Sequence, residues 1–450
     1  MNDSYDLIVI GSGTAAQVAS TRARAAGWTV AVIDHRPFGG TCALRGCDPK
    51  KMLISGAEGV DGVRRMRGHG VEGDVCIEWP ELIAFKRTFT DPVPAKQEAR
   101  YAHLGIDAFH GLARFVGPNS LEIDGKLRIG RHVLIATGAR PAPLGIPGEE
   151  HVVFSDQFLE METLPRRIAL IGGGYIAAEF SHIAARAGAH ITILQRNPRL
   201  LPAFDPDLVS WLMAKFDELN IDARTETAVE AVEAIPGGGY RVQARAGNAD
   251  ASVEADLVVH AAGRVPALDA LDVAAAGISV KKGRLVLNEF LQSVSNPAVY
   301  AAGDAAGVGP PLTPVSSHDA KIVAANLLEG AARHRPDYRG VPSVAFTIPP
   351  IAAVGLSEAA ARERFPKVRV KSESVPDWYT ARRLAEKVYG YKTLVDEDTG
   401  TIVGAHLVGP HVDEVINIFG LAIRRGLTVD DLKSTIFAYP TGASDIGYML

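Results

Sequence analysis

Two cysteines stand close together near the N-terminus, in the stretch GGTCALRGCDPKK at residues 39 to 51. Cys42 and Cys47 have four residues between them and are two of the chain's three cysteines. A pair at this spacing can bind zinc, form a structural disulfide or cycle between dithiol and disulfide. Zinc requires four ligands, and the sequence has no second CxxC and no nearby HxxxH. Three cysteines are also too few for a secreted disulfide framework, so redox or metal chemistry is favoured in a reducing compartment.

The spacing of the pair constrains the local backbone. Five residues of undistorted helix rise about 7.5 Å, whereas the Cα atoms of a disulfide lie about 4.4 to 6.8 Å apart. A helix that starts near the second cysteine is compatible with a bond, and Asp48 followed by Pro49 predicts an N-cap with proline at the first helical position. Cys47 then stands just before a helix N-terminus, where partial positive charge and Lys50 favour its thiolate, while the Asp48 carboxylate disfavours it. The third cysteine, Cys76, is expected to be a small core residue.

Two glycine-rich turns supply elements that can hold nucleotides near such a pair. Each lies in a run of apolar strand, turn, alanine-rich helix and second strand, at residues 5 to 34 and 166 to 196. The first glycine turns the chain, the second lets a pyrophosphate approach backbone N–H groups, and the third position lets the helix pack on the strand. Two copies predict two βαβ nucleotide-binding units. The three motif positions are Gly11, Gly13 and Ala16 in the first run and Gly172, Gly174 and Ala177 in the second.

The residues at the ends of the second strands distinguish the two predicted sites. Asp34 is an acceptor suited to the ribose diol of a nucleotide without a 2′-phosphate. The other strand ends at Gln195 and Arg196, with Arg199 three residues on. Because a cation in place of the acid favours a 2′-phosphate, we expect NADPH rather than NADH at the second site.

Length and charge restrict the class of protein. At 450 residues the chain is long enough for two to four domains. A net charge of −5, a pI near 6.2 and no long basic run argue against nucleic acid as a partner. Apolar runs are short and broken by glycine, and no basic region precedes the first strand pattern, so neither a membrane span nor a signal peptide is predicted. We therefore expect a cytoplasmic protein with no membrane partner.

Motifs along nearly the whole chain resemble one family. They run from Tyr5 to about Pro440 and are GxGxxA with Asp34, GGTCxxxxCxPKK at 39 to 51, ATGxxP at 136 to 141, GGGYIAAE at 172 to 179, AAGRVP at 261 to 266, YAAGD at 300 to 304 and LTPV at 312 to 315. The chain is identified as a member of the class I flavin-dependent pyridine nucleotide-disulfide oxidoreductases, which include glutathione reductase, dihydrolipoamide dehydrogenase and mercuric reductase. The resemblance implies an enzyme with FAD and NADPH as cofactors, in which Cys47 is the flavin-facing thiol and Cys42 the interchange thiol that meets the acceptor.

The resemblance also implies the fold class, α/β, with two Rossmann-like nucleotide-binding domains and a C-terminal α+β dimerisation domain. Residues 1–142 and 264–332 are expected to form the FAD-binding domain, with the NADPH-binding domain, residues 143–263, inserted between them. From about residue 336 the sequence changes to strand-like runs followed by helix patterns. This pattern predicts a separate α+β domain, and the resemblance implies that residues 336–450 form the interface of a homodimer.

Further family roles carry over to matching positions. Lys50 and Glu179 resemble the ion pair beside the flavin N5. Tyr175 resembles the aromatic lid over the flavin, and Asp304 resembles the ligand of the flavin linker. The motif positions that complete the expected cofactor site are Gly40, Thr41, Thr137, Gly138, Gly263 and Thr313.

The C-terminal stretch departs from the disulfide reductases of the family. They carry a His-Pro-Thr motif and a glutamate behind the histidine, which together protonate the leaving thiol. Here the matching stretch is FAYPTGAS, with Tyr439 at the histidine position and Ser444 at the glutamate position. A tyrosine, with an unperturbed pKa of about 10, does not readily shuttle a proton at neutral pH. Mercuric reductase also has a tyrosine here, so we expect the acceptor to be a metal or metalloid ion held by the cysteine thiolates, or another small electrophile.

Two other functions stay open. One is a glutathione reductase-like or dihydrolipoamide dehydrogenase-like enzyme in which Tyr439, or a histidine such as His318 or His411, supplies the acid. The other is a flavin-binding protein whose cysteines sense oxidants or sequester a metal without turnover. Steady NADPH oxidation with an added acceptor distinguishes an enzyme from such a sensor.

Overall fold

The chain folds into two compact units, each of which is considered separately. The computed structural model describes residues 3–331 and 333–450, so the predicted domain limits at residues 1 and 332 lie outside the described residues. The first unit contains the described residues up to Lys50 together with Phe85–Ala142 and Arg264–Tyr338. The second unit contains Lys51–Ala84, Pro143–Gly263 and Arg339–Leu450.

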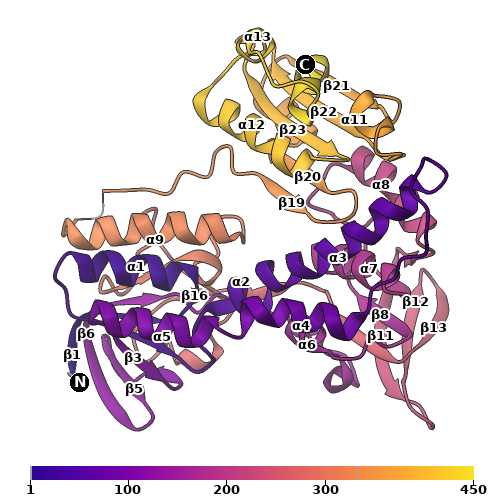
Figure 1. Cartoon of the computed structure of the whole chain (residues 1–450). Helices are drawn as coiled ribbons and strands as arrows, with labels where there is room; N and C mark the ends of the chain where they lie inside the picture. Colours follow the sequence, from indigo (N-terminus) through magenta and orange to yellow (C-terminus); the bar gives the residue numbers. More distant parts are fainter. Residues whose placement is uncertain (1–2, 332) are drawn as a thin grey trace. The chain divides into compact units, whose positions relative to one another are not determined.

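A seven-stranded sheet forms the centre of the first unit (Figure 1). β1, β2, β3, β6 and β18 run parallel, whereas β4 and β5 form an antiparallel extension of β6. The helices α1 (Thr14–Ala25) and α9 (Thr313–Leu328) lie side by side in this unit, and α5 (Val93–Leu104) packs against β3. In spatial order the strands are β3 (Asp107–His110), β2 (Val30–Asp34), β1 (Ser4–Ile10), β6 (Lys126–Ile135), β5 (Ser120–Ile123) and β4 (Ala113–Phe115), with β18 (Val299–Ala301) also paired to β6.

The second unit contains the other predicted βαβ unit. Its four-stranded parallel sheet has the order β10 (Asp222–Arg224), β9 (His190–Leu194), β8 (Arg167–Ile171) and β14 (Leu257–His260). Helix α7 (Tyr175–Arg186) connects β8 to β9, and α8 (Pro206–Glu218) follows β9. The Asp205 side chain caps α8 by accepting the Asp207 N–H at 3.0 Å. Further elements are α6 (Ser155–Glu160) and an antiparallel sheet of β11 (Thr227–Ala234), β12 (Tyr240–Ala246) and β13 (Ala249–Ala255).

The C-terminal part of the second unit is a five-stranded antiparallel sheet with helices. Helix α12 (Val412–Arg425) packs on β20 and β23 through a buried apolar face that includes Ile416 and Phe419. The strand order is β19 (Ser343–Ala345), β20 (Ile351–Gly355), β23 (Ile402–Val408), β22 (Gly390–Asp396) and β21 (Val368–Ser374). The other helices are α10 (Glu358–Arg364), α11 (Tyr379–Arg382), α13 (Val429–Ser434) and α14 (Ile446–Met449).

Two helices belong in part to each unit. Helix α3 (Cys47–Met66) begins in the first unit and continues in the second after Lys50, and α4 (Trp79–Thr90) passes back to the first after Ala84. Residues 51–84, predicted as part of the FAD-binding domain, therefore pack with the second unit. The reason is their apolar face, which lies in the core of that unit and includes Leu53, Ile54, Ala57, Trp79 and Ile83. The four-part domain division stays a prediction.

Short elements complete the described chain. In the first unit β7 (Ala139–Pro141) pairs with β15 (Arg264–Pro266), and β16 (Val280–Lys281) pairs with β17 (Arg284–Leu285), both in antiparallel register. Four short 3-10 helices are η1 (Glu149–His151), η2 (Asp269–Leu271), η3 (Gly303–Ala305) and η4 (Gly442–Asp445).

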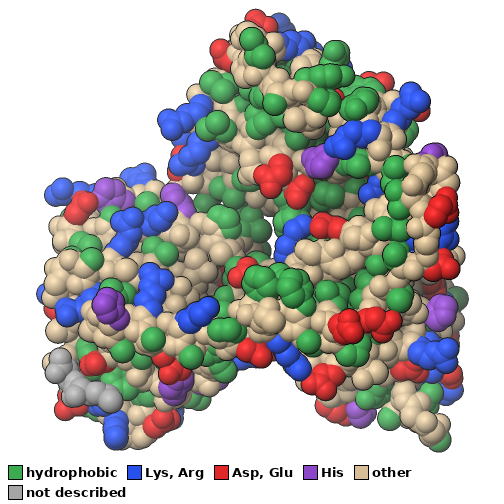
Figure 2. Space-filling model, in the orientation of Figure 1, with side chains coloured by type: hydrophobic (Ala, Val, Ile, Leu, Met, Phe, Trp, Pro, Cys, Tyr) green, Lys and Arg blue, Asp and Glu red, His purple; other side chains and the backbone are tan. Residues whose placement is uncertain are grey.

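The arrangement confirms the predicted α/β class. Each glycine-rich turn follows a parallel strand and precedes a helix, and a separate antiparallel sheet with helices occupies the C-terminal part. Among the described residues, no helix combines the length and the apolar character that crossing a bilayer requires. On the face shown in Figure 2, Lys and Arg side chains are interspersed with Asp and Glu side chains.

Candidate functional site

The two cysteines lie where two helices of the first unit meet. Cys42 is in α2 (Gly40–Arg45), Cys47 is the first residue of α3, and only Gly46 separates the helices. Gly46 has φ −147° and ψ −110°, far from helical values, so it interrupts the helical path between the cysteines. Both cysteines are free thiols, so the structure shows the dithiol form. Cys47 Sγ lies 3.5 Å from the hydroxyl of Thr313, the first residue of α9.

The two thiols differ in proton affinity. The hydrogen bond from Cys42 is the largest influence on Cys47. With the Thr313 hydroxyl and the Lys50 charge, it lowers the pKa of Cys47 to about 6 although burial opposes the shift. The same bond, together with burial, raises the pKa of Cys42 above its usual range. At neutral pH the pair therefore keeps its proton on Cys42, and Cys47 is the thiolate, which is the reactive form of the side chain.

Asp48 does not cap α3, so the sequence-based prediction of the cap is wrong. The helix already begins at Cys47, and the Lys50 N–H donates to the Gly46 carbonyl at 3.1 Å. Asp48 therefore lies in the first turn, where its carboxylate accepts a hydrogen bond from Cys42 Sγ at 3.9 Å. Burial raises the pKa of Asp48, and the contact with Cys42 opposes this shift. The carboxylate thus lies against the Cys42 thiol.

The first glycine-rich turn packs against the cysteine segment. Gly11 has φ +110°, and a Cβ on it would lie 2.3 Å from the Ala136 carbonyl oxygen. Gly40, two residues before Cys42, has φ +74°, and a Cβ there would lie 2.3 Å from Gly13 Cα. Side chains are therefore excluded from both positions. Gly13 precedes α1 without a side-chain cap, so the first N–H groups of this helix can bind a pyrophosphate.

The side chains around this turn fit the flavin nucleotide that the sequence predicts. Thr137 Oγ1 is buried with no hydrogen-bond partner among the described residues, so a bound group can satisfy it. Asp34 accepts hydrogen bonds from Ser12 N and Oγ at 2.9 and 2.6 Å and from Arg36 N at 3.0 Å, which leaves acceptor capacity for a ribose diol. Asp304 lies in η3 directly after β18, and burial raises its pKa.

The other predicted positions around the flavin site occupy consistent places. Ala16 is fully buried in α1, which lets the helix approach the sheet closely. Thr41 precedes Cys42 in α2, and Gly138 follows Thr137 with φ +69°. Gly263 has φ +105° and stands directly before β15, as the last residue of a segment of the second unit.

The second glycine-rich turn has the same geometry as the first. Gly172 has φ +106°, and a Cβ on it would lie 2.4 Å from the Ala261 carbonyl oxygen. Gly174 precedes α7 without a side-chain cap, and Ala177 is fully buried. Tyr175 is the first residue of α7 and is exposed, and its role as a lid stays a prediction.

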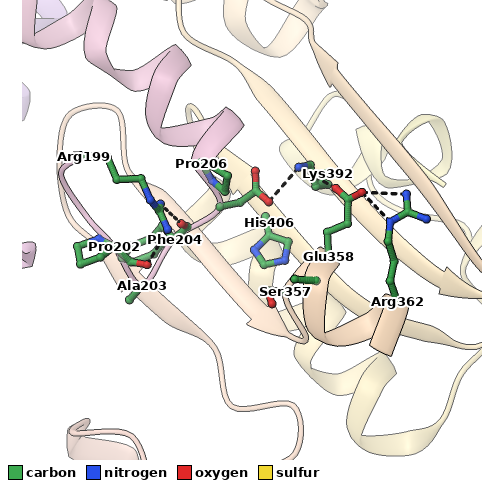
Figure 3. A pocket seen from close by; sticks show the side chains of 12 residues that line it. Arg199, Pro202, Ala203, Phe204, Pro206, Ser357, Glu358, Arg362, Lys392 and His406 are labelled. Carbon is green, nitrogen blue, oxygen red and sulfur yellow. Dashed lines mark hydrogen bonds and ion pairs between the residues drawn. The ribbon is translucent and has the colours of Figure 1, made fainter. Parts of the chain in front are cut away.

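The two arginines predicted to bind a 2′-phosphate have different surroundings. Arg196 is exposed directly after Gln195, at the end of β9. Arg199 donates to the carbonyls of Phe204 and Pro202 at 2.7 and 3.0 Å and lines a pocket of about 620 Å³ in the second unit (Figure 3). Because Arg199 already binds its own loop, Arg196 is the better placed of the two to meet a phosphate.

Lys50 and Glu179 belong to different units, so the ion pair expected between them stays a prediction. Lys50 is in the first turn of α3, where its charge lowers the pKa of Cys47. Glu179 is buried in α7, and its Oε1 accepts a hydrogen bond from Phe346 N at 2.8 Å.

Tyr439 is 78% exposed in the second unit. Its ring stacks on Tyr379, with the ring centroids 6.4 Å apart. Ser444 does not support the tyrosine as the family's glutamate supports its histidine, because Ser444 Oγ donates to the Thr441 carbonyl at 2.6 Å.

The histidines considered as replacements have local contacts. His318 Nε2 accepts a hydrogen bond from Asp337 N at 3.1 Å, and His411 Nε2 lies 3.0 Å from Arg383 Nη2. Within the described ranges, His, Cys, Asp and Glu side chains form no group of three or more that could hold a metal ion.

The sequence motifs did not point to Ser12, which is fully buried between the first two motif glycines. Its Oγ donates to Asp34 and accepts from Gly39 N at 3.2 Å, so it ties the turn to the strand end and to the cysteine segment. A hydroxyl residue between two motif glycines was the available signal. Cys76 is exposed, so its predicted place in the core is wrong, because it lies in a polar stretch between α3 and α4.

Comparison with known proteins identifies the family. Residues 5–320 match the family described as pyridine nucleotide-disulphide oxidoreductase, and residues 341–449 match its dimerisation domain. The chain belongs to the pyridine nucleotide-disulphide oxidoreductase family. The predicted family is therefore confirmed, and the chain is an oxidoreductase of a family that depends on FAD and a pyridine nucleotide.

Relatives within the pyridine nucleotide-disulphide oxidoreductases carry different names. The chain is 33% identical to the mercuric reductase of Staphylococcus aureus, over 98% of this chain and 81% of the relative. It is 33% identical to the glutathione reductase of Burkholderia cepacia, over 98% of this chain and 97% of the relative. A solved Cu(II) complex of the HOCl-induced flavoprotein disulfide reductase RclA from Escherichia coli matches with a TM-score of 0.89 and 28% identity, covering 100% of this chain and 99% of that one. The names agree on reduction and differ in the acceptor.

Proposed function

We propose that this chain is a homodimeric NADPH oxidoreductase that passes electrons through Cys47 and Cys42 to thiophilic metal ions, each electron pair reducing one mercuric ion or two cupric ions. The observation that carries the proposal is the uneven thiol pair: the hydrogen bond from Cys42, the Thr313 hydroxyl 3.5 Å from Cys47 Sγ and the Lys50 charge lower the pKa of Cys47, and Cys42 keeps its proton. Cysteine thiolates are soft ligands, so they bind soft metal ions in preference to hard cations. When bound, FAD would accept a hydride from the nicotinamide and deliver the electron pair to the cysteines.

The chain's own residues bind and orient the two nucleotides in this scheme. The N-terminus of α1 binds the flavin pyrophosphate, and Asp34 binds the ribose diol. The N-terminus of α7 binds the pyrophosphate of the nicotinamide nucleotide, and Arg196 binds the 2′-phosphate, which supports NADPH over NADH. Residues 341–449, matched to the dimerisation domain, support a homodimer.

The surroundings of Tyr439 support a metal acceptor. Reducing a disulfide releases a thiol that must be protonated, whereas reducing a metal ion at the cysteine pair forms no such leaving group. Tyr439, which is exposed, and Ser444, whose Oγ donates to the Thr441 carbonyl, do not reproduce the acid of the disulfide reductases. The mercuric reductase relative and the Cu(II) complex of the solved relative are consistent with this acceptor class.

A glutathione-type disulfide reductase is the second candidate. Asp48 favours it, because its carboxylate accepts a hydrogen bond from Cys42 and can therefore take the thiol proton when Cys42 attacks a disulfide. The match to the glutathione reductase relative, which covers 97% of that protein, also supports this second candidate.

The redox role of the pair is tested by anaerobic titration of the purified holoenzyme with NADPH while its absorption spectrum is recorded. We expect one reducing pair to produce the long-wavelength band of a thiolate beside oxidised flavin. This band should be absent in Cys47→Ser. Direct bleaching of the flavin in the wild type, without uptake of electrons by the disulfide, would reject the redox role of the pair.

The acceptor is tested by steady-state NADPH oxidation with mercuric ion, cupric ion and glutathione disulfide. We expect turnover with at least one metal ion to exceed the oxygen background tenfold or more and to be lost in Cys42→Ser. Turnover with glutathione disulfide alone would favour the second candidate.

A further inference from the structure

A buried chain of charges in the second unit contains none of the residues to which the proposed function gives a role. The side chains of Arg186 on α7 and Asp61 on α3 are 1% and 6% exposed. Arg186 Nε and Nη2 donate to Asp61 Oδ1 at 3.1 and 2.6 Å, and Arg65 Nε donates to Asp61 Oδ2 at 2.6 Å. A buried ion pair is by itself weak evidence of stabilisation, because desolvation offsets much of the attraction. The other contacts of these groups therefore matter more than the pair itself.

Those contacts fasten the backbone of residues 346–348 along one face of α7. Phe346 N donates to Glu179 Oε1 at 2.8 Å, and Ile348 N donates to His182 Nδ1 at 3.0 Å. Arg186 Nη2 donates to the Ile348 carbonyl at 3.1 Å. Positions 179, 182 and 186 are spaced i, i+3 and i+7, so their side chains project from the same side of the helix. The segment is thus held at both ends by the helix that carries Glu179.

His182 is suited to be a permanent acceptor in this arrangement. It is completely buried, and burial together with the charges of Arg186 and Lys215 holds its pKa well below the usual range. The ring is therefore neutral, and because Nδ1 accepts from Ile348 N, the proton is on Nε2. Its ring packs edge-on against Phe216, with the centroids 4.6 Å apart. Protons from solution do not switch this contact near neutral pH.

Helix α3 holds the same segment from a second side. Lys51 Nζ lies 4.5 Å from the centroid of the Phe346 ring. Asp61, further along α3, binds Arg186. Burial alone would raise the pKa of Asp61, but the charges and hydrogen bonds of Arg186 and Arg65 outweigh it and lower the pKa, so the carboxylate stays ionised. The helix that begins at Cys47 is therefore joined to the helix that carries Glu179.

We propose that Arg186, paired with Asp61, is a positioning residue for hydride transfer. It fixes residues 346–348, and the Phe346 N–H in turn fixes the carboxylate of Glu179. The inference rests on the proposed function and on the family resemblance, which implies a place for Glu179 beside the flavin. Arg186 does not touch the reacting atoms, and it acts only through the segment and Glu179.

The direct test is hydrogen exchange of the full-length holoenzyme, followed in peptides that cover residues 343–350. We expect these amides to exchange at least tenfold faster in Arg186→Met than in the wild type. Asp61→Asn, which keeps the shape of the side chain, should show the same direction of change and serves if Arg186→Met does not fold. Unchanged exchange in a folded variant would overturn the inference.

The matched control is Lys392→Met, which removes a buried cation from another cluster of the same unit. The Lys392 side chain is 4% exposed and lies 3.0 Å from Asp205, 2.7 Å from Asp207 and 3.2 Å from Glu358, at the pocket of Figure 3. These three partners all lie outside residues 346–348. We expect exchange of the amides of that segment to stay as in the wild type, and an equal increase in the control would assign the effect to lost stability.

The second readout is the rate of flavin reduction by NADPH, measured by stopped flow under anaerobic conditions. Arg186→Met should reduce this rate tenfold or more, with FAD content and the dissociation constant of NADPH unchanged. Arg186→Lys should recover part of the rate because it keeps the charge. A wild type that NADPH does not reduce would reject the proposed function, whereas a normal wild type with equally fast variants would reject only the positioning role.

Discussion

Thr313, at the start of α9, adds to the effect of Cys42 in lowering the pKa of Cys47. Replacing it with valine removes the hydroxyl 3.5 Å from Cys47 Sγ that helps to lower the pKa of Cys47 to about 6. The wild-type thiolate is present above about pH 6 and is lost as the pH falls through that value. We expect Thr313→Val to raise this midpoint, measured by the thiolate–flavin absorption band of the two-electron-reduced enzyme. Thr313→Ser keeps the hydroxyl and should titrate like the wild type, and equal midpoints for both variants would contradict the role of the hydroxyl.

Tyr439 provides a second test at single residues, because it separates the two acceptor classes. The double variant Tyr439→His with Ser444→Glu restores the residue types of the disulfide reductases. We expect its turnover with glutathione disulfide to rise tenfold or more, since a positioned general acid contributes about 10²–10⁴-fold. Ser444→Glu alone is the control and should not gain. Metal-ion turnover of Tyr439→Phe should stay within about tenfold of the wild type, and a larger loss would show that the hydroxyl takes part.

The members of the site were predictable from the sequence, but their contacts were not. Cys42, Cys47 and Thr313 stand in recognisable motifs, although the thiolate and the hydroxyl that contact each other are 266 residues apart. Asp48 was misplaced because a cap was inferred from Asp-Pro alone, whereas Gly46 interrupts the chain earlier and Cys42 attracts the carboxylate. No sequence motif pointed to the role of Arg186, since its partner Asp61 is 125 residues away in the sequence.

Among the elements, α2 and α3 carry glycines with opposite requirements. We expect Gly40→Ala to abolish FAD binding or folding, because a Cβ would lie 2.3 Å from Gly13 Cα and φ is +74°. A Cβ on Gly59, in the middle of α3, would meet no atom within 4 Å, and φ there is not positive, so Gly59→Ala should stabilise the protein by about 0.5–1 kcal/mol. The FAD content and the thermal unfolding temperature of each variant test these two expectations. An FAD-replete, fully stable Gly40→Ala protein would contradict the close approach.

The two βαβ units were predictable as elements because strand, glycine turn and helix follow one another locally. Gly11 and Gly172 both have positive φ, and a Cβ on either would clash with a backbone carbonyl oxygen, as expected of a tight turn. The unit with which α3 packs was harder to predict, because an apolar helix face does not indicate which hydrophobic core it joins. Leu53 and Ile54 pack with the second unit although Cys47, on the same helix, belongs to the first.

For the whole molecule, the proposed homodimer predicts a sensitive surface on residues 341–449. Ile436 is 98% exposed and Leu421 is also exposed, and apolar side chains of this size are expected to be covered in a dimer. We expect the double variant Ile436→Lys with Leu421→Lys to weaken dimerisation at least tenfold, measured by sedimentation velocity over a range of concentrations. Val294→Lys, which changes an exposed apolar residue outside that range, is the control. Equal dimer stability in both would place the interface elsewhere.

Gly40 packs so closely on Gly13 Cα that no side chain fits at position 40, between the nucleotide turn and the cysteine segment. The CxxxxC stretch therefore cannot be transplanted into another protein on its own. Grafted into another nucleotide-binding protein, it would need a host turn whose backbone packs against Gly40 in the same way, as well as its own cysteines. Protein engineers who wish to transplant this chemistry should move the two stretches together, and lineages that lose Gly40 should lose the flavin and the redox pair in the same step.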